Sequence, residues 1–182
     1  MNKKIIFILF LFFTSIAIFA EGLKGIFGIE FGKTSTEVQK AMEEKGWKQI
    51  KKEGTGVRFE KKNGTYANLK VSYMDFDFYE DKFYNVRITF PVNTDAEDIV
   101  EALDVIRESC QLTRVSEKQD KFYGYDVLVY DYTDPDMNIF SLTFMVKGNS
   151  YISSFTLTNS EIAIEAEREE SEKKNKLISS DL

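Results

Sequence analysis

The sequence predicts an α+β fold in which helices pack against one face of an antiparallel sheet. Two observations lead to this prediction. Segments of alternating apolar residues follow one another with short polar turns between them, which is typical of antiparallel strands. Two segments with a helical apolar period interrupt them, and a third ends the chain. We therefore expect two tandem units, each a helix plus about four strands, in a two-layer sandwich with a C-terminal helix.

Composition excludes several classes of function. The 182 residues carry 24 Lys and Arg against 30 Asp and Glu, with no His and one Cys. The chain therefore has no Ser-His-Asp triad, no His-ligated metal and no internal disulfide. The net charge of -6 disfavours nucleic acid as a partner. No catalytic motif is present, so we expect a protein that is not an enzyme and needs no cofactor.

Residues 1–20 have the pattern of a secretory signal peptide. Lys3 and Lys4 precede an apolar run from Ile5 to Ala20, and polar residues follow at once. The run has 16 residues, fewer than the ~20 that span a bilayer, which favours cleavage near Ala20 over a retained anchor. We expect a periplasmic or secreted protein whose only membrane contact is this segment before cleavage.

Three helix starts share one motif. Thr34, Thr94 and Thr158 each precede a Glu by three positions and each follow a strand-like segment. Such a pair forms a capping box, in which the two side chains satisfy each other's backbone N–H groups. The near-constant spacing indicates a repeated unit. The predicted organisation is a signal peptide at 1–20, a first unit at 21–93, a second unit at 94–160, and a helix with a charged tail at 161–182.

The first unit begins with a predicted helix at 35–45. A weak strand at 47–52, a strand containing Val57 and Phe59, and a hairpin turn at Asn63-Gly64 follow. The next predicted strand starts at Ala67, and every second residue from there to Tyr73 is apolar. From Met74 onward the apolar residues occupy the other alternate positions. Such a change indicates a bulge or a side-chain set on the opposite face.

The second unit repeats this order. A predicted helix at 95–109 places Ile99, Leu103 and Cys110 on one face, so Cys110 should lie at the edge of the core as a small hydrophobic residue. Four strands follow, at 112–116, 122–132, 140–146 and 151–157. The terminal helix carries Glu and Lys at i, i+4 spacing, which supports a solvated helix.

The stretch Gly28–Trp47, GIEFGKTSTEVQKAMEEKGW, resembles the opening of small exported domains of the β-lactamase-inhibitor-protein and BamE/SmpA group. In that group a strand leads through a G-x-T/S-x-x-x-V pattern, here Gly32 to Val38, into a short helix and an antiparallel sheet. The resemblance implies a tandem helix-plus-strand fold that binds other proteins. This chain departs from the group because it has no disulfide and no lipidation motif.

A set of apolar residues points away from the predicted core. These residues lie at equivalent places in the two units and are Met74, Phe76, Phe78, Leu128, Tyr130, Tyr132 and Ile139. On an uncovered sheet face they would form a patch rimmed by carboxylates, which is typical of a protein-binding site. Alternatively, the C-terminal helix or a second protomer covers them.

Two acidic clusters have alternative interpretations. Asp75, Asp77, Glu80 and Asp81 could supply a glycosidase pair, or they could be a solvated strand face that runs into a turn. Asp134, Asp136 and Asn138 have the spacing of a calcium loop, but Ile139 and Met145 replace its Gly and distal Glu. A hairpin turn uses the same residue types.

We therefore expect an exported, non-catalytic binding domain that engages another envelope or secreted protein through an open sheet face. A carrier of an apolar small ligand is the first alternative. A carboxylate-dependent cell-wall hydrolase is the second.

Overall fold

The computed structural model describes residues 22–180, with side chains through residue 175. The predicted signal peptide, and with it the expected export, lies outside the described residues. The α+β class is confirmed, because the described chain forms one large antiparallel sheet and three helices. The helices are α2 (Ser35–Glu44), α3 (Ala96–Cys110) and α4 (Ser160–Ser180). No helix in this part of the chain is both long and apolar enough to cross a bilayer.

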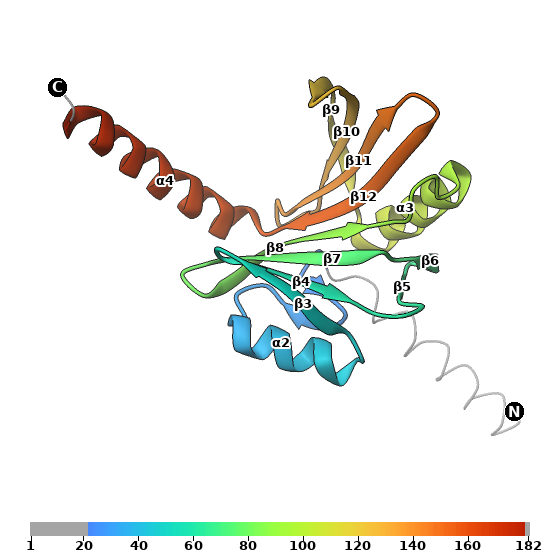
Figure 1. Cartoon of the computed structure of the whole chain (residues 1–182), viewed down its shortest axis with the longest axis horizontal. Helices are drawn as coiled ribbons and strands as arrows, with labels where there is room; N and C mark the ends of the chain where they lie inside the picture. Colours follow the sequence, from blue (N-terminus) through green and yellow to red (C-terminus); the bar gives the residue numbers. More distant parts are fainter. Residues whose placement is uncertain (1–21, 181–182) are drawn as a thin grey trace, which may run out of the picture.

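Eight strands form the large sheet in the order β3-β4-β7-β8-β12-β11-β10-β9 (Figure 1). All neighbouring strands in it are antiparallel. The strands are β3 (Lys48–Glu53), β4 (Gly56–Glu60), β7 (Tyr73–Tyr79), β8 (Lys82–Thr89), β9 (Thr113–Phe122), β10 (Tyr125–Thr133), β11 (Ile139–Lys147) and β12 (Ser150–Thr158). Two small hairpins pair β1 (Gly25–Ile26) with β2 (Ile29–Glu30), and β5 (Thr65–Tyr66) with β6 (Leu69–Lys70).

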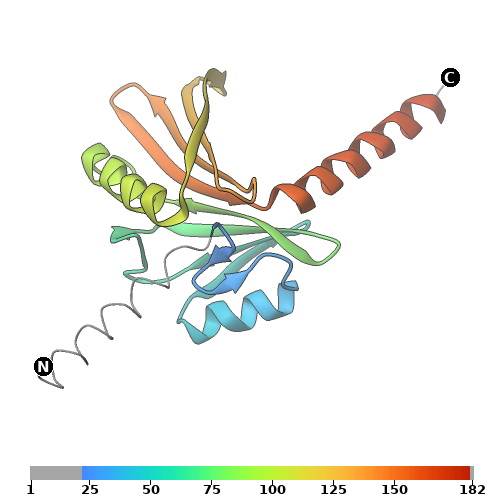
Figure 2. The same ribbon diagram turned by 180° about the vertical axis from the view of Figure 1, so that it is seen from behind.

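The core lies on one face of this sheet. Buried side chains from α2 and α3, such as Val38 and Ile99, meet buried strand residues there. Figure 2 shows α2 beside the half built from β3 to β8 and α3 beside the other half, while α4 points away from the body. Six phenylalanines with almost no exposed surface fill the core: Phe59, Phe76, Phe83, Phe90, Phe140 and Phe155.

The predicted capping box of α2 is confirmed. The Glu37 amide donates to Oγ1 of Thr34 at 3.3 Å, and the Thr34 amide donates to Oε2 of Glu37 at 2.9 Å. Both side chains thereby satisfy backbone donors that the first turn of a helix leaves without partners. The helix then ends beside Gly46, whose φ of +80° suits glycine.

The other two capping boxes are wrong by one residue. Asp95, not Thr94, caps α3, because its Oδ1 accepts the Glu97 amide at 2.8 Å. Asn159, not Thr158, accepts the amide of the third residue along, at 3.0 Å, where α4 begins. Asp and Asn cap helices at least as well as Thr. The threonine motif therefore marked the helix starts only approximately.

The strand predicted through Ala67 to Tyr73 is also corrected. Ala67 and Asn68 have φ of 48° and 65° and form the turn between β5 and β6. The change of apolar phase before Met74 therefore falls between a small hairpin and β7, not inside one strand. Asn63-Gly64 lies between β4 and β5, which belong to different sheets, so it is not a hairpin turn. Gly64 packs on Trp47 instead: a Cβ at this position would lie 2.8 Å from the Trp47 ring.

Candidate binding face

The seven apolar residues predicted to bind a partner do not form an exposed patch. Met74, Phe76, Phe78 and Tyr132 are buried, whereas Leu128, Tyr130 and Ile139 are half-buried. The prediction of an open apolar face is therefore wrong for the buried four. The physical reason is that these four residues occupy the alternate strand positions whose side chains point into the core. Phe76, for example, packs edge-to-face on Phe59 at 5.5 Å between ring centroids.

The register also separates members of this set. Tyr130 pairs with Leu142 and lies on the core face, whereas Ile139 pairs with Thr158, which pairs with Asn85 on the opposite face. Side chains on neighbouring strands share a face when their residues are directly paired. No single surface therefore contains all seven residues.

A row of polar residues crosses the face opposite the core. One continuous row of cross-strand pairs takes a residue from each of the eight strands. We call these residues the polar row: Lys51, Arg58, Asp75, Arg87, Thr156, Ser141, Asp131 and Ser116. None of them is buried. Water or a partner can therefore reach every strand of the sheet from this side.

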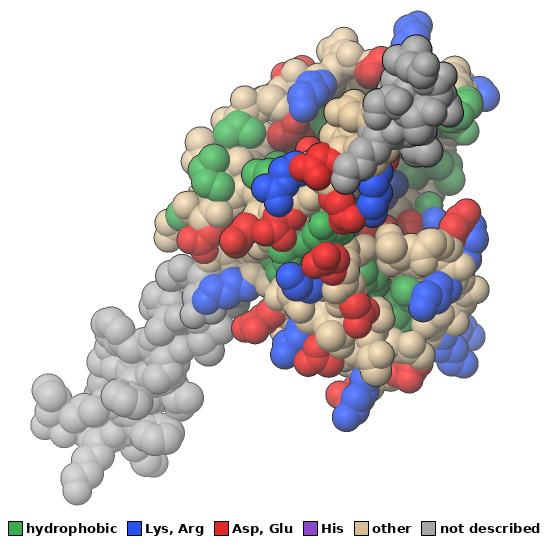
Figure 3. Space-filling model, turned by 90° about the vertical axis from the view of Figure 1, so that its left-hand side faces the viewer, with side chains coloured by type: hydrophobic (Ala, Val, Ile, Leu, Met, Phe, Trp, Pro, Cys, Tyr) green, Lys and Arg blue, Asp and Glu red, His purple; other side chains and the backbone are tan. Residues whose placement is uncertain are grey.

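A second row runs beside the polar row, two residues away on each strand except β9, where the register shift at Val115 makes the step three residues. It comprises Glu53, Gly56, Asp77, Asn85, Thr158, Ile139, Thr133 and Thr113, and none of these is buried either. Acidic and basic side chains are interspersed, not segregated, on the side of the molecule from which α4 leaves (Figure 3). Donors and acceptors of both signs are therefore available along these two rows, whereas Val127, Val129, Met145 and Ile152 lie on the same face further along β10, β11 and β12.

Arg58 and Asp75 form the best-ordered pair of the polar row. Nε of Arg58 donates to Oδ1 of Asp75 at 2.6 Å and Nη2 donates to Oδ2 at 2.9 Å, a bidentate geometry. The guanidinium also lies 3.8 Å from the ring centroid of Tyr73. The hydrogen bonds to Asp75 raise the pKa of Arg58 above its ordinary value. Both carboxylate oxygens of Asp75 are therefore engaged within the protein.

Asp77 has a separate set of partners. Its Oδ2 accepts from Nδ2 of Asn85 at 2.7 Å, and Oδ1 of Asn85 accepts from the Thr158 hydroxyl at 2.8 Å. A Cβ at Gly56 would lie 3.1 Å from Oδ1 of Asp77, so glycine leaves room for that carboxylate. Asp75 and Asp77 thus serve cross-strand contacts, which is the solvated-strand interpretation of this acidic cluster.

Glu80 and Asp81 occupy the β7–β8 turn, with φ of 48° and 62°. Oδ1 of Asp81 accepts the amide of Ser35 at 3.0 Å in the first turn of α2. The hydrogen bonds from Ser35 lower the pKa of Asp81 below its ordinary value. This turn therefore supports the start of α2.

Asp131 anchors the other half of the polar row. Its carboxylate accepts from the hydroxyls of Ser116 and Ser141, both at 2.7 Å, and from Nζ of Lys118 at 3.2 Å. Partial burial pushes the pKa of Asp131 upward, but the two hydroxyls and Lys118 together outweigh it and hold the pKa below its ordinary value. This carboxylate thus organises three strands.

Arg87 stands at the centre of the polar row, between Asp75 and Thr156. It is exposed, and within the described chain it makes no hydrogen bond or ion pair. A shallow cavity of about 200 Å³ lies beside it, lined also by Lys51 and Glu53. A free guanidinium is a strong donor to carboxylates and carbonyls, so Arg87 is the most available contact on this face.

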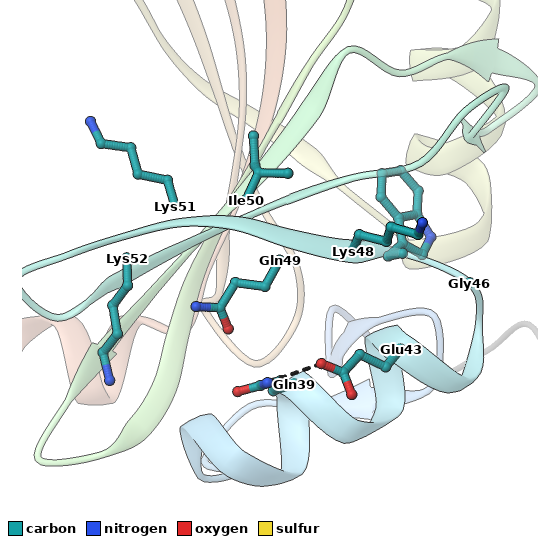
Figure 4. Close-up of a pocket in the computed structure, with 9 residues that line it drawn as sticks. Gln39, Glu43, Gly46, Lys48, Gln49, Ile50, Lys51 and Lys52 are labelled. Atoms are coloured by element: carbon teal, nitrogen blue, oxygen red, sulfur yellow. Dashed lines mark hydrogen bonds between the residues drawn. The ribbon is translucent and has the colours of Figure 1, made fainter.

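A larger hollow of about 590 Å³ lies between α2 and the edge strand β3. Figure 4 shows Gln49 and Lys52 on the side of α2, with Ile50 and Lys51 directed away from it. On the helix, Nε2 of Gln39 donates to Glu43 at 2.9 Å. This hollow is open and lined mainly by mobile lysine and glutamine chains, so it offers fewer fixed donors than the polar row.

The predicted calcium loop is closed by protein donors. Oδ1 of Asp134 accepts the Asn138 amide at 2.7 Å, and Oδ2 accepts the Leu23 amide at 2.7 Å and Nδ2 of Asn138 at 3.1 Å. Asp136 is exposed beside them. No group of three or more potential ligands that could hold a metal occurs among residues 22–175. The loop acts as a turn in this fold.

Cys110 lies at the edge of the core, as predicted, and is half-buried. Burial, followed by the charge of Asp134, raises the pKa of its thiol above the ordinary value. A raised pKa disfavours the reactive thiolate.

The central members of the polar row, Arg58, Arg87, Thr156 and Ser141, are absent from the predicted site. Each occupies the polar position of an alternating strand, and this alternation was the signal that could have found them.

Comparison with protein-family models, curated proteins and solved structures gives no match to this chain.

Proposed function

We propose that this chain is a non-catalytic binding domain that engages another exported protein through the polar face of its sheet. The supporting observation is the unbroken, accessible polar row across all eight strands. Most of its charged members are paired and half-buried, so they are already held in position. Side chains that are ordered before binding lose less conformational entropy when a partner arrives.

The dimensions favour a macromolecule over a small ligand. Neighbouring strands are about 4.8 Å apart, so seven strand spacings give a row of roughly 34 Å. A surface of that length matches one side of a standard protein interface, which buries about 800 Å² per partner. The adjacent cavity of about 200 Å³ is below the usual size of a small-molecule site, about 300–1,000 Å³.

Within this face we assign the anchor role to Arg87. Arginine is enriched among the residues that dominate binding energy, especially near the centre of an interface. Arg58 is already held by Asp75, whereas Arg87 has all its donors available to a partner. A partner that presents carboxylate or carbonyl groups fits this site.

Both alternative functions have less support. A carrier needs a cavity between sheet and helices, and that space is filled by fully buried side chains such as Phe59, Phe83 and Phe155. A hydrolase needs a carboxyl group that is free to exchange a proton, and both oxygens of Asp75 are held by Arg58.

We also infer that the two halves arose by copying one unit of a helix and four large-sheet strands. The supporting observation is the strand order. β8 and β12, the last strands of the two units, are neighbours at the centre of the sheet, and the earlier strands of each unit lie progressively further out, to β3 at one edge and β9 at the other. The last strand of each unit is central and the first is an edge. Such an arrangement is expected of two equivalent units related by a twofold axis.

Site-specific photocrosslinking tests the binding proposal. A photoreactive amino acid replaces Thr156, the direct neighbour of Arg87 in the polar row, in the protein expressed in its own host, and adducts are identified by mass spectrometry. We expect one discrete protein adduct, which disappears when Arg87 is also changed to Glu. The same probe at Val105, an exposed residue of α3, is the matched control and should give no adduct.

Two outcomes would contradict the proposal. One is the absence of any adduct at position 156, or an adduct there that survives Arg87→Glu. The other is the same set of adducts at positions 156 and 105, which would indicate random collision.

A further inference from the structure

The large sheet has two open edges. β3 and β9 stand at its ends, so one side of each backbone has no neighbouring strand within the described chain. In β9 every residue except Ser116 is exposed, over a length of ten residues. An exposed edge strand is a template for pairing with another chain unless its sequence prevents it.

The sequence of β3 prevents such pairing. Lys48, Lys51 and Lys52 give this six-residue strand a strong positive charge, and a register shift at Ile50 interrupts it. Edge lysines and bulges are the usual devices that keep edges apart. Two copies of β3 would oppose lysine to lysine.

The charge pattern of β9 has the opposite property. β9 has a register shift of its own, at Val115, but this lies outside residues 117–121. Residues 117–121 read Glu-Lys-Gln-Asp-Lys, so the charges are opposite at equal distances on either side of Gln119. In an antiparallel pair of identical strands centred on Gln119, Glu117 faces Lys121 and Lys118 faces Asp120. A twofold axis repeats each contact. All the charged pairs are then attractive, and there are no repulsive ones.

We propose that two copies of this protein associate through their β9 edges, antiparallel and centred on Gln119. The two sheets then continue into one another with their cores on the same side. This interface is separate from the polar face and does not depend on a partner binding there. The self-complementary charges of residues 117–121 favour a second copy of this chain as the partner at this edge.

Neighbouring registers are disfavoured. Moving the centre by one residue toward the N-terminus opposes Lys118 to its own copy, and moving it by one residue toward the C-terminus opposes Asp120 to its own copy. Directly opposed like charges destabilise strand pairs. A centre between two residues would place the core face of one sheet beside the polar face of the other. The pattern therefore specifies one register.

Exposed apolar residues lie at both ends of the same pairing. Val115, 57% exposed at the register shift of β9, and Tyr123, 84% exposed in the turn after β9, flank the paired segment at its two ends. Phe122 packs edge-to-face on Tyr123 at 4.5 Å. Tyr123 has φ of 48°, which is unfavourable for an aromatic residue, and the fold gives it little packing in return. A second copy would cover these side chains.

The present partners of the β9 charges do not compete strongly. Lys118 reaches Asp131 at 3.2 Å and Lys121 reaches Asp126 at 3.4 Å, and both lysines are highly exposed. Glu117 accepts from Nη2 of Arg114, and both of these side chains are exposed as well. Exposed pairs of this kind exchange partners readily. A single strand pair is smaller than a standard interface of about 1,600 Å², so we expect a weak, salt-sensitive dimer.

Sedimentation equilibrium of the purified protein, up to about 1 mM at low salt, tests this proposal. We expect a monomer–dimer equilibrium that weakens at least tenfold in 0.5 M NaCl. Glu117→Lys and Lys121→Glu should each abolish the dimer, because each creates two repulsive contacts. An equimolar mixture of the two variants should recover a heterodimer, since one strand is then positive and the other negative at these positions.

A disulfide trap fixes the register. In a Cys110→Ser background, Gln119→Cys should form a dimer on mild oxidation, because directly paired residues have Cα atoms about 4.5–5.5 Å apart, within disulfide range. Thr113→Cys is the control: its two copies would be roughly 40 Å apart along the strands and should stay reduced.

A wild-type protein that is monomeric at every concentration would overturn the proposal. Single variants that dimerise like wild type, or a mixture that does not recover association, would also overturn it by showing that another surface is used. Circular dichroism of each variant confirms that the charge changes leave the fold intact.

Discussion

The backbone amide of Leu23 donates a 2.7 Å hydrogen bond to Oδ2 of Asp134, 111 residues further along the chain. Both residues are buried. Asn138 completes the contact, because its Nδ2 donates to the Leu23 carbonyl at 3.1 Å. The segment before β1 is therefore fixed to the turn between β10 and β11, which joins the start of the described chain to the second half of the sheet.

This contact predicts a large stability loss for Asp134→Ala. The change leaves buried amides of Leu23 and Asn138 without an acceptor, and each such loss costs about 1–3 kcal/mol. We expect the free energy of unfolding, measured by urea denaturation, to fall by about 2–4 kcal/mol. Asp136→Ala, at an exposed position of the same turn, is the control and should change it by less than about 0.5 kcal/mol. Equal effects of the two changes would contradict this assignment.

The sequence predicted the elements of the fold better than their ends. Alternation with tight turns identified most of the strands, and the helical period placed α3 correctly to within one residue. The strands predicted at 112–116 and 122–132 are corrected, because β9 continues to Phe122 and the chain turns at Tyr123-Gly124. The hairpin at Ala67-Asn68 was missed because Ala67 is not a typical turn residue, although the two-residue loop with positive φ at both positions is a common hairpin connection. There, tertiary contacts such as the packing of Gly64 on Trp47 decide the chain path.

Capping of α3 gives a second prediction. Asp95→Ala removes the side chain that accepts the Glu97 amide, and loss of such a cap lowers stability by about 1 kcal/mol. Asp98 also lies in the first turn of α3 but makes no capping hydrogen bond. Asp98→Ala should therefore have about half the effect of Asp95→Ala or less, since it loses only the favourable interaction with the helix dipole. Urea denaturation measures both. A larger effect of Asp98→Ala would contradict the cap assignment.

The binding face illustrates why site prediction from sequence is harder. Met74 and Asp75 are adjacent and point to opposite faces, and the sequence does not say which face the helices cover. Choosing the wrong one exchanges core for surface in every strand, because the side-chain period is two. The amphipathic helices set this choice through Val38 and Ile99, whose burial only the tertiary structure shows.

Cys110 provides a third prediction. Burial raises the pKa of its thiol and restricts access to it, so modification should be slow in the folded protein. With a thiol reagent at pH 8 we expect at least a tenfold lower rate than for the same protein in denaturing urea. Equal rates in both conditions would show that the thiol is freely exposed.

The contact between Tyr79 and Glu169 gives a pH-dependent prediction. The Tyr79 hydroxyl donates to Oε2 of Glu169 at 2.6 Å and links the β7–β8 hairpin to α4. This hydrogen bond, followed by partial desolvation and the charges of Glu169, Glu80 and Glu165, raises the pKa of Tyr79 to about 12. Because the folded pKa lies above the ordinary value of about 10, the contribution is complete below pH 10 and is lost as pH rises toward 12.

On the acid side the sign is reversed. Hydrogen bonds from Lys173 and then Tyr79 lower the pKa of Glu169, so its contribution is present above the ordinary pKa of 4.5 and is lost as pH falls through the lowered value. We expect amide hydrogen exchange in the first half of α4 to be slowest between these limits. Tyr79→Phe should remove the alkaline change in exchange and one late-titrating phenol from the absorbance at 295 nm. Tyr125→Phe, on the β10 strand, is the control and should leave the exchange of α4 unchanged; an alkaline change that persists in Tyr79→Phe would assign the docking of α4 to other contacts.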